Sequence, residues 1–422
     1  MDFNLSSLFV CLLITILACY WVVRGERLKL RVFFILFYAF FLLYCGIGGT
    51  AKAANPIYMI YYYSYLAIIT LVFLAFKQHY KYNVTKIYAT NCVIDDYIEA
   101  KSLNIIILYS IINLSTLLFP SNRIMLLFNP PIADINTHLD FYREGSTFGV
   151  IDFARILMLP FFYWALSHLR CKNVIVICFF LLLNMYIEYC CNSYMGREPM
   201  LMLIVIVSMY IYNNTKHKQM LLITGILLVP LLGLFFVQYS FVRVGYGMED
   251  ISYGDAMNTL IEQESNYPLQ FDSYYNKSGG YEGDYFEWLF LLPLPGFLKG
   301  GHGGALFNEL FTNVSSNRYS WESGFSIALP GLVGDSIFLF KQFFFIHAII
   351  LSTSISLFVR YFEKYASFEF LYYYVLMRLS MGPARSGTQG PYSFIFKAAL
   401  IFIILVSFII KKKQYNRKYL LK

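Results

Sequence analysis

Residues 220–238 read MLLITGILLVPLLGLFFVQ, and a long polar stretch, Tyr239 to Asp335, follows them directly. The polar stretch is rich in Gly, Asn, Ser, Tyr and acidic residues, whereas the chain on both sides of it is one apolar window after another. An apolar run of this length is enough for a helix to cross a bilayer. A large polar segment held between membrane spans suggests a protein whose ligand is partly lipid and partly polar.

The composition indicates an integral membrane protein. Of the 422 residues, 58% are hydrophobic and only 14% are charged, whereas a soluble protein carries about 25% charged residues. The net charge of +8 comes from residues at span ends rather than from one basic patch, so we expect no nucleic-acid partner. None of the eight cysteines lies in the polar stretch, which argues against a disulfide framework there.

The apolar windows predict an all-α polytopic fold with about eleven transmembrane helices and one large external loop late in the chain. This divides the chain into eight spans within 1–238, the large loop 239–335, and three spans with a basic tail in 336–422. The expected spans are 5–23, 32–50, 57–76, 103–119, 150–168, 174–191, 199–212, 220–238, 336–358, 367–380 and 392–410.

Basic residues fall on alternate connections between these spans, which predicts the orientation in the membrane. The basic set includes Arg24 to Arg31, Lys77 to Lys101, Arg360 and the tail after Ile410. We therefore expect this side to face the cytoplasm, with the N-terminus on the periplasmic side and the C-terminus in the cytoplasm. The loop 239–335 and the turns at 51–56 and 381–391 would then be periplasmic.

The external segments carry arginines that suit a diphosphate, because guanidinium groups bind phosphate oxygens in pairs and stay charged near a membrane. Arg197, Arg243 and Arg385 each lie at a helix end beside glycine or proline, where a rigid clamp could be built. Arg155 and Arg378 fall inside apolar spans, where an arginine is costly and points to function. The alternatives are solvated interface residues and, for Arg155, pairing with Asp152 or Glu188. The residues expected to contact a diphosphate are Arg143, Arg155, Arg197, Arg243 and Arg385.

The large loop offers groups for sugars and for proton transfer. Aromatic rings beside polar side chains are typical of sugar sites, although an aromatic belt at the membrane interface is an equal alternative. Asp335 sits at the predicted start of a span, where a partly desolvated carboxylate could act as a general base; the alternative is a helix N-cap. Glu322 is the second candidate catalytic carboxylate. The residues expected to contact sugar are Tyr281, Arg318, Tyr319 and Trp321.

The six histidines show no metal-ligand spacing, so we expect no metal site and no cofactor. Walker, Gly-x-Ser-x-Gly and two-histidine motifs are also missing from the sequence.

Four local features together with the layout of spans resemble the O-antigen polymerases, the Wzy-type polymerases of oligosaccharide repeat units. These features are Gly196-Arg197 entering a span, Arg243 after the next span, Gly334-Asp335 opening the span after the loop, and the segment from Arg378 to Arg385. That family often has Gly-Glu in place of Gly334-Asp335, and a glycine in place of Lys341.

The resemblance implies a metal-independent, inverting glycosyltransferase of the GT-C type in the bacterial inner membrane. Its donor and acceptor would both be glycans on undecaprenyl diphosphate, its surroundings membrane lipid, and a further partner a polysaccharide chain-length regulator. Three alternatives stay open at this point. The first is a flippase or other transporter of lipid-linked oligosaccharides, and the second a membrane acyltransferase. The third is an O-antigen ligase, which would carry a catalytic histidine where this chain has Ser320.

Overall fold

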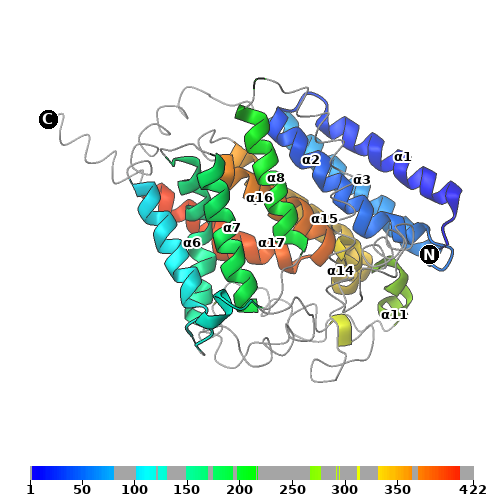
Figure 1. Ribbon diagram of the computed structural model, residues 1–422. Coiled ribbons are helices and arrows are strands. Elements are labelled where there is room, and N and C mark those ends of the chain that lie inside the picture. The colour runs from blue at the N-terminus through cyan, green and yellow to red at the C-terminus, as the bar shows by residue number, and fades with distance from the viewer. Residues whose placement is uncertain are drawn as a thin grey trace.

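The computed structural model describes residues 2–79, 101–119, 122–130, 149–169, 174–192, 197–214, 216, 267–276, 291, 294, 311–313, 331–363 and 369–408 (Figure 1). Within these ranges the regular secondary structure is helical, apart from one isolated antiparallel bridge between Phe3 and Ala51. The prediction of an all-α membrane protein is confirmed at this level.

Six helical segments in the described ranges are long and apolar enough to cross a membrane. They are Leu5–Val23, Leu28–Thr50, Pro56–Lys77, Val150–Ser167, Gly331–Glu363 and Gly390–Phe408. Three further expected spans correspond to shorter apolar helices, Lys101–Ser115, Ile175–Cys191 and Leu203–Tyr212. The expected span 220–238 lies outside the described residues, so the count of eleven stays a prediction.

The longer helices take the following bounds. They are α1 (Leu5–Val23), α2 (Leu28–Phe41), α3 (Pro56–His79), α6 (Gly149–Ser167), α7 (Val174–Asn192), α8 (Arg197–Asn214), α14 (Gly331–Phe340), α15 (Phe344–Glu363) and α16 (Glu369–Ser386). The chain continues from α2 through a π-helical turn, Leu42–Gly46, and a 3-10 turn, Ile47–Thr50. A short helix in the large loop, α11 (Phe271–Asn276), follows a 3-10 turn, Tyr267–Gln270. The last helix begins as α17 (Gln389–Phe394) and passes through a π-helical segment, Ile395–Ala399.

Helix α16 is the centre of the bundle. Figure 1 shows it between the α1–α3 group and the α6–α8 group, and nearly every residue from Phe370 to Ala384 is buried. This helix is not one of the six apolar spans, because its tyrosines and Arg378 lower its hydropathy. Polar side chains are tolerated there because they face protein rather than lipid. Its partner α2 contributes Phe33, Phe34 and Phe37 to the shared aromatic core.

The expected span 336–358 is two helices rather than one. Helix α14 begins at Gly331 and has 10 residues, so at about 1.5 Å per residue it covers roughly half of a bilayer core. Lys341 then adopts a left-handed backbone with φ of 48°, and a 3-10 turn leads into α15. Left-handed backbone is costly for a residue with a side chain, so the break is built by packing and not by local sequence preference.

The expected loop 381–391 is also largely helical. Helix α16 continues through Pro383 to Ser386 and ends at Gly387, whose φ of +64° is the usual left-handed helix ending. The turn before the last helix therefore consists of Gly387 and Thr388.

Ion pairs hold together the basic connections at one end of the bundle. The pairs are Arg360–Glu26 (2.7 Å), Arg27–Glu363 (3.3 Å) and Lys29–Glu369 (3.9 Å). At the opposite end, the turn after Thr50 meets the large loop, where the Asn55 amide donates a 2.6 Å hydrogen bond to Asp272. The connections expected on opposite membrane sides thus lie at opposite ends of the bundle; which end faces the cytoplasm stays a prediction.

Candidate functional site

A cavity of about 400 Å³ lies among α6, α7, α8, α16, α17 and the helix Lys101–Ser115. Most of its wall is apolar, as expected inside a membrane bundle. Its polar lining consists of two arginines, one carboxylate, one amide, three tyrosines and a serine: Arg155, Arg378, Glu188, Asn184, Tyr109, Tyr163, Tyr374 and Ser386. Both arginines that the sequence places inside apolar spans therefore line the same cavity.

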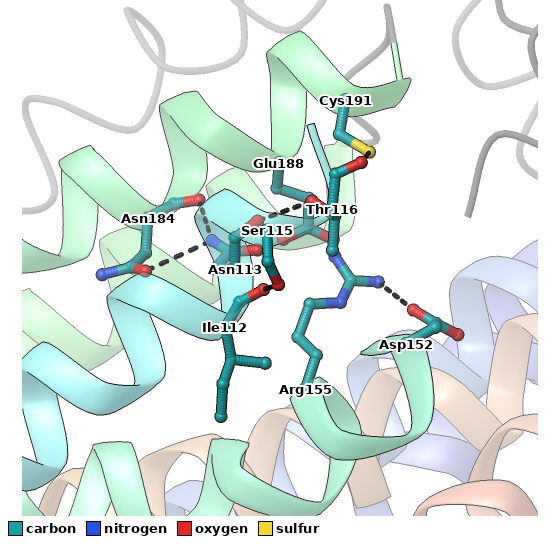
Figure 2. Close-up of polar contacts among 9 residues, drawn as sticks. All are labelled: Ile112, Asn113, Ser115, Thr116, Asp152, Arg155, Asn184, Glu188 and Cys191. Carbon is teal, nitrogen blue, oxygen red and sulfur yellow. Dashed lines mark hydrogen bonds and ion pairs between the residues drawn. The ribbon is translucent and has the colours of Figure 1, made fainter. Parts of the chain in front are cut away.

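Arg155 is held between two carboxylates. Its guanidinium lies 2.8 Å from Asp152, one turn earlier on α6, and 3.6 Å from Glu188 on α7. Figure 2 shows the Arg155 side chain directed at Asp152. The structure shows the pairing that the sequence left open for Arg155, with both Asp152 and Glu188, and Arg155 also lines the cavity; its contact with a diphosphate stays a prediction. A buried arginine needs such partners, because an isolated charge in an apolar bundle is costly.

Arg378 reaches the cavity from α16, with its guanidinium 5.8 Å from the centre of the Tyr374 ring. The ring of Tyr374 stacks in turn on Tyr163 from α6, at 4.5 Å between centroids. A second stacked pair, Tyr109 with Phe162, also has its centroids 4.5 Å apart. These ring contacts fix the cavity wall across helices that are distant in the sequence.

Asn184 joins α7 to the helix Lys101–Ser115. The Asn113 amide donates to the Asn184 backbone carbonyl at 3.0 Å and to its side-chain oxygen at 3.2 Å (Figure 2). Asn184 itself donates to Ser110 at 3.1 Å. Inside a bilayer such amide pairs replace water as partners. One face of α7 therefore presents Asn184 and, four residues later, Glu188 to the cavity.

The charged part of the cavity lies toward the bundle end that is opposite the basic connections. Helix α6 ends at Ser167, whose hydroxyl accepts a 3.0 Å hydrogen bond from the Phe370 amide. Phe370 follows Glu369, which pairs with Lys29 at the basic end of the bundle. Arg155 lies in the second turn of α6, far from that end. Arg155 and its two partners are thus on the side expected to be periplasmic.

Asp335 does not line this cavity. The sequence suggested a carboxylate at the membrane surface, but the side chain is completely buried, in the second turn of α14. It accepts hydrogen bonds from the Thr388 backbone amide, at 2.5 Å, and from the Thr388 hydroxyl. Asp335 does not cap its own helix, which begins four residues earlier. It binds the residue that precedes α17.

The other expected site residues fall into two groups. Arg385 is half-buried in the last turn of α16, one residue before the cavity-lining Ser386, and Arg197 begins α8. The second group lies outside the described residues: Arg143, Arg243, Tyr281, Arg318, Tyr319, Trp321 and Glu322.

Among the loop aromatics that are described, Tyr274 is part of the core. Its side chain is buried against Phe271 and Phe311, at 5.7 and 5.1 Å between ring centroids. Burial raises the pKa of Tyr274 well above its usual value, so its hydroxyl stays protonated. Its two neighbours attach the loop to the bundle, because Phe271 packs against Tyr58 of α3 and Phe311 against Phe338 of α14.

Sequence reasoning missed Asn184 and Glu188 as site residues. Their signal was present: two polar side chains four residues apart inside an apolar window share one helix face.

In the described ranges, no group of three or more His, Cys, Asp or Glu residues could hold a metal ion.

In comparisons with protein-family models, with curated proteins and with solved structures, the chain matches none of them.

Proposed function

We propose that this chain is a membrane glycosyltransferase that polymerises oligosaccharide repeat units carried on undecaprenyl diphosphate. The observation that supports the proposal best is the cavity of about 400 Å³ with tyrosines, an amide and paired charges inside an apolar bundle. A cavity of that size is suited to one or two sugar rings, since ligand pockets span about 300–1,000 Å³.

The charges around the cavity favour the sugar, rather than the diphosphate, as the part of the substrate that enters the cavity. Two guanidinium groups, Arg155 and Arg378, and two carboxylates lie at the cavity; Glu188 is in the lining, Asp152 lies beside it, and both carboxylates pair with Arg155. A cavity with balanced charge suits a neutral ligand with many hydroxyl groups better than a diphosphate. The predicted external arginines would then bind the diphosphate. Two of them are Arg385, in the last turn of α16, and Arg197, at the start of α8.

The proposed reaction forms one bond and breaks another. An acceptor sugar hydroxyl attacks the anomeric carbon of the donor chain, and the bond from that carbon to the lipid diphosphate oxygen breaks. The hydroxyl proton passes to a carboxylate, and arginines stabilise the charge that develops on the leaving diphosphate. Glu188 is the carboxylate on the cavity wall, so we assign it the role of proton acceptor.

Deletion of the gene, followed by gel analysis of the surface polysaccharide, tests this function. A polymerase leaves a single repeat unit on the lipid acceptor, and a plasmid copy of the gene restores the ladder. Loss of every repeat unit would instead indicate the flippase or the ligase. Lipid-linked repeat units that remain on the cytoplasmic face would identify the flippase.

A further inference from the structure

Asp335 joins α14 to the start of α17 through Thr388. Thr388 is the N-cap residue of α17, and in a capping box the amide of that residue is bound by an acidic or amide side chain at the third helical position. Here that position is Pro391, which has no acceptor side chain. Asp335, which lies on α14, supplies this acceptor instead. Its Oδ2 atom is 2.5 Å from the Thr388 amide nitrogen.

The contact continues into a chain of buried hydrogen bonds. The Thr388 hydroxyl lies 2.7 Å from His347 Nε2 on α15, and His347 Nδ1 lies 3.2 Å from the Tyr65 hydroxyl on α3. Because the Thr388 hydroxyl donates to Asp335, Nε2 carries the donor hydrogen, and in the neutral imidazole Nδ1 then accepts from Tyr65. The four side chains are buried, so each bond acts in a medium where losing a partner is costly.

Asp335 has no room to meet a substrate. A side-chain carbon on Gly387 would lie 2.7 Å from Asp335 Oδ2 and 2.8 Å from its Cγ, and the backbone of Gly387 is left-handed. The carboxylate is therefore pressed against the turn that separates α16 from α17. A general base must come within hydrogen-bond reach of the proton that it removes, and this carboxylate is enclosed by the turn instead.

The same turn carries part of the cavity wall. Ser386 and Gly390, two residues before and two residues after Thr388, line the cavity, and Phe394 follows one turn later on α17. We propose that Asp335 is a positioning residue, which fixes the Gly387–Thr388 turn and through it the wall formed by Ser386 and Gly390. Its part in catalysis, which rests on the proposed function, is to hold this wall in place.

Two substitutions separate positioning from proton transfer. Asp335→Asn keeps an oxygen that accepts from Thr388 but is not a base, whereas Asp335→Leu has similar bulk and no acceptor. We expect polymer synthesis in the deletion strain to fall less than about tenfold for Asn and more than about a hundredfold for Leu, because only the Leu variant loses the acceptor for Thr388. If Asp335 were a general base, the Asn variant would itself lose about 10²–10⁴-fold. An Asn variant as inactive as the Leu variant, at equal amounts in the membrane, would overturn the positioning role.

A second measurement does not depend on activity. A cysteine introduced at Ser386 reports the position of the wall through its rate of reaction with a small maleimide. The chain with Ser386 intact gives the background from the eight native cysteines. We expect Asp335→Leu to change the rate at least threefold and Asp335→Asn to leave it close to the parent rate. An unchanged rate in the Leu variant rejects positioning even if the protein makes no polymer. A changed rate, in a chain whose parent form makes no polymer in the deletion strain, rejects only the proposed function.

Discussion

Arg360 on α15 donates a 2.7 Å hydrogen bond to Glu26, which lies in the connection between α1 and α2, and both side chains are buried. The two residues are 334 positions apart, so the contact ties the first hairpin of the bundle to its late helices. It lies among the basic connections, at the end expected to face the cytoplasm. Arg360 therefore marks the expected cytoplasmic side by its charge, and its pairing with Glu26 also holds the helices together.

Replacing Arg360 with methionine should destabilise the protein strongly, because Glu26 would keep a buried charge without its partner. Removing one member of a buried ion pair costs about 3–5 kcal/mol. We expect a clear drop in the unfolding temperature of the detergent-purified protein, measured by intrinsic fluorescence.

Lys52→Met provides the matched control for Arg360. Lys52 also pairs with a carboxylate, Asp2, at 3.6 Å, but the two side chains are 67% and 86% exposed. An exposed pair contributes about 0–1 kcal/mol, so this variant should unfold close to the parent temperature. Equal losses in both variants would contradict the role assigned to the buried pair.

The sequence predicted the helices whose apolar pattern is complete and missed features that depend on packing. The windows 5–23 and 57–76 match α1 and α3 closely, because each faces lipid along much of its length. The break at Lys341 was not predicted, since the apolar residues continue on both sides of it. The central place of α16 was also hidden, because a helix surrounded by protein does not need an apolar surface.

The candidate site was predictable in part. Arg155 and Arg378 stood out because an arginine inside an apolar span needs a reason, and both line the cavity. That they share one cavity depends on how α6 packs on α16, which one sequence does not reveal. The same holds for Asp335, whose partner Thr388 lies 53 residues away.

Reporter fusions at Lys277 and Lys418 should report opposite compartments. Both positions lie outside the described residues, one in the large loop and one in the basic tail. The positive-inside rule places the basic tail in the cytoplasm. A phosphatase that is active only in the periplasm should therefore work at Lys277 and be silent at Lys418. Activity at both sites, or at neither, would contradict the topology.

Alanine at Arg197, Arg243 or Arg385 should each cripple polymer formation while the protein still inserts. The reason is the loss of a paired donor for the leaving diphosphate. Lysine at the same positions should restore little, because a point charge does not replace the guanidinium fork. Gel analysis of polysaccharide from the complemented deletion strain measures the effect. Normal ladders from all three alanine variants would reject the diphosphate assignment.

Polymer synthesis in membrane vesicles should survive an excess of chelator. This expectation rests on the sequence, in which no cluster of acidic residues and histidines has metal-ligand spacing. Arginines can supply the positive charge that a metal ion would otherwise provide. Vesicles treated with chelator and then with added Mg²⁺ or Mn²⁺ form the comparison. Activity that disappears with chelator and returns with the metal would favour a metal-dependent transferase.

Glu188→Gln should reduce polymer synthesis by about 10²–10⁴-fold, the usual contribution of a general base. Glu188 lines the cavity and its side chain is 44% exposed, so it can meet an acceptor hydroxyl, and the glutamine variant keeps its shape without its basicity.

Asp152→Asn is the matched control for Glu188. Asp152 also binds Arg155, at 2.8 Å, but it lies one turn before Arg155 on α6 and is not part of the cavity lining. Removing its charge should leave Arg155 paired with Glu188 and lower synthesis less than about tenfold. Rates should be compared at equal protein amounts in vesicles that contain lipid-linked repeat units. If both variants lose activity equally, the carboxylates act by holding Arg155, and the proton acceptor must be sought in the large loop, beginning with Glu322.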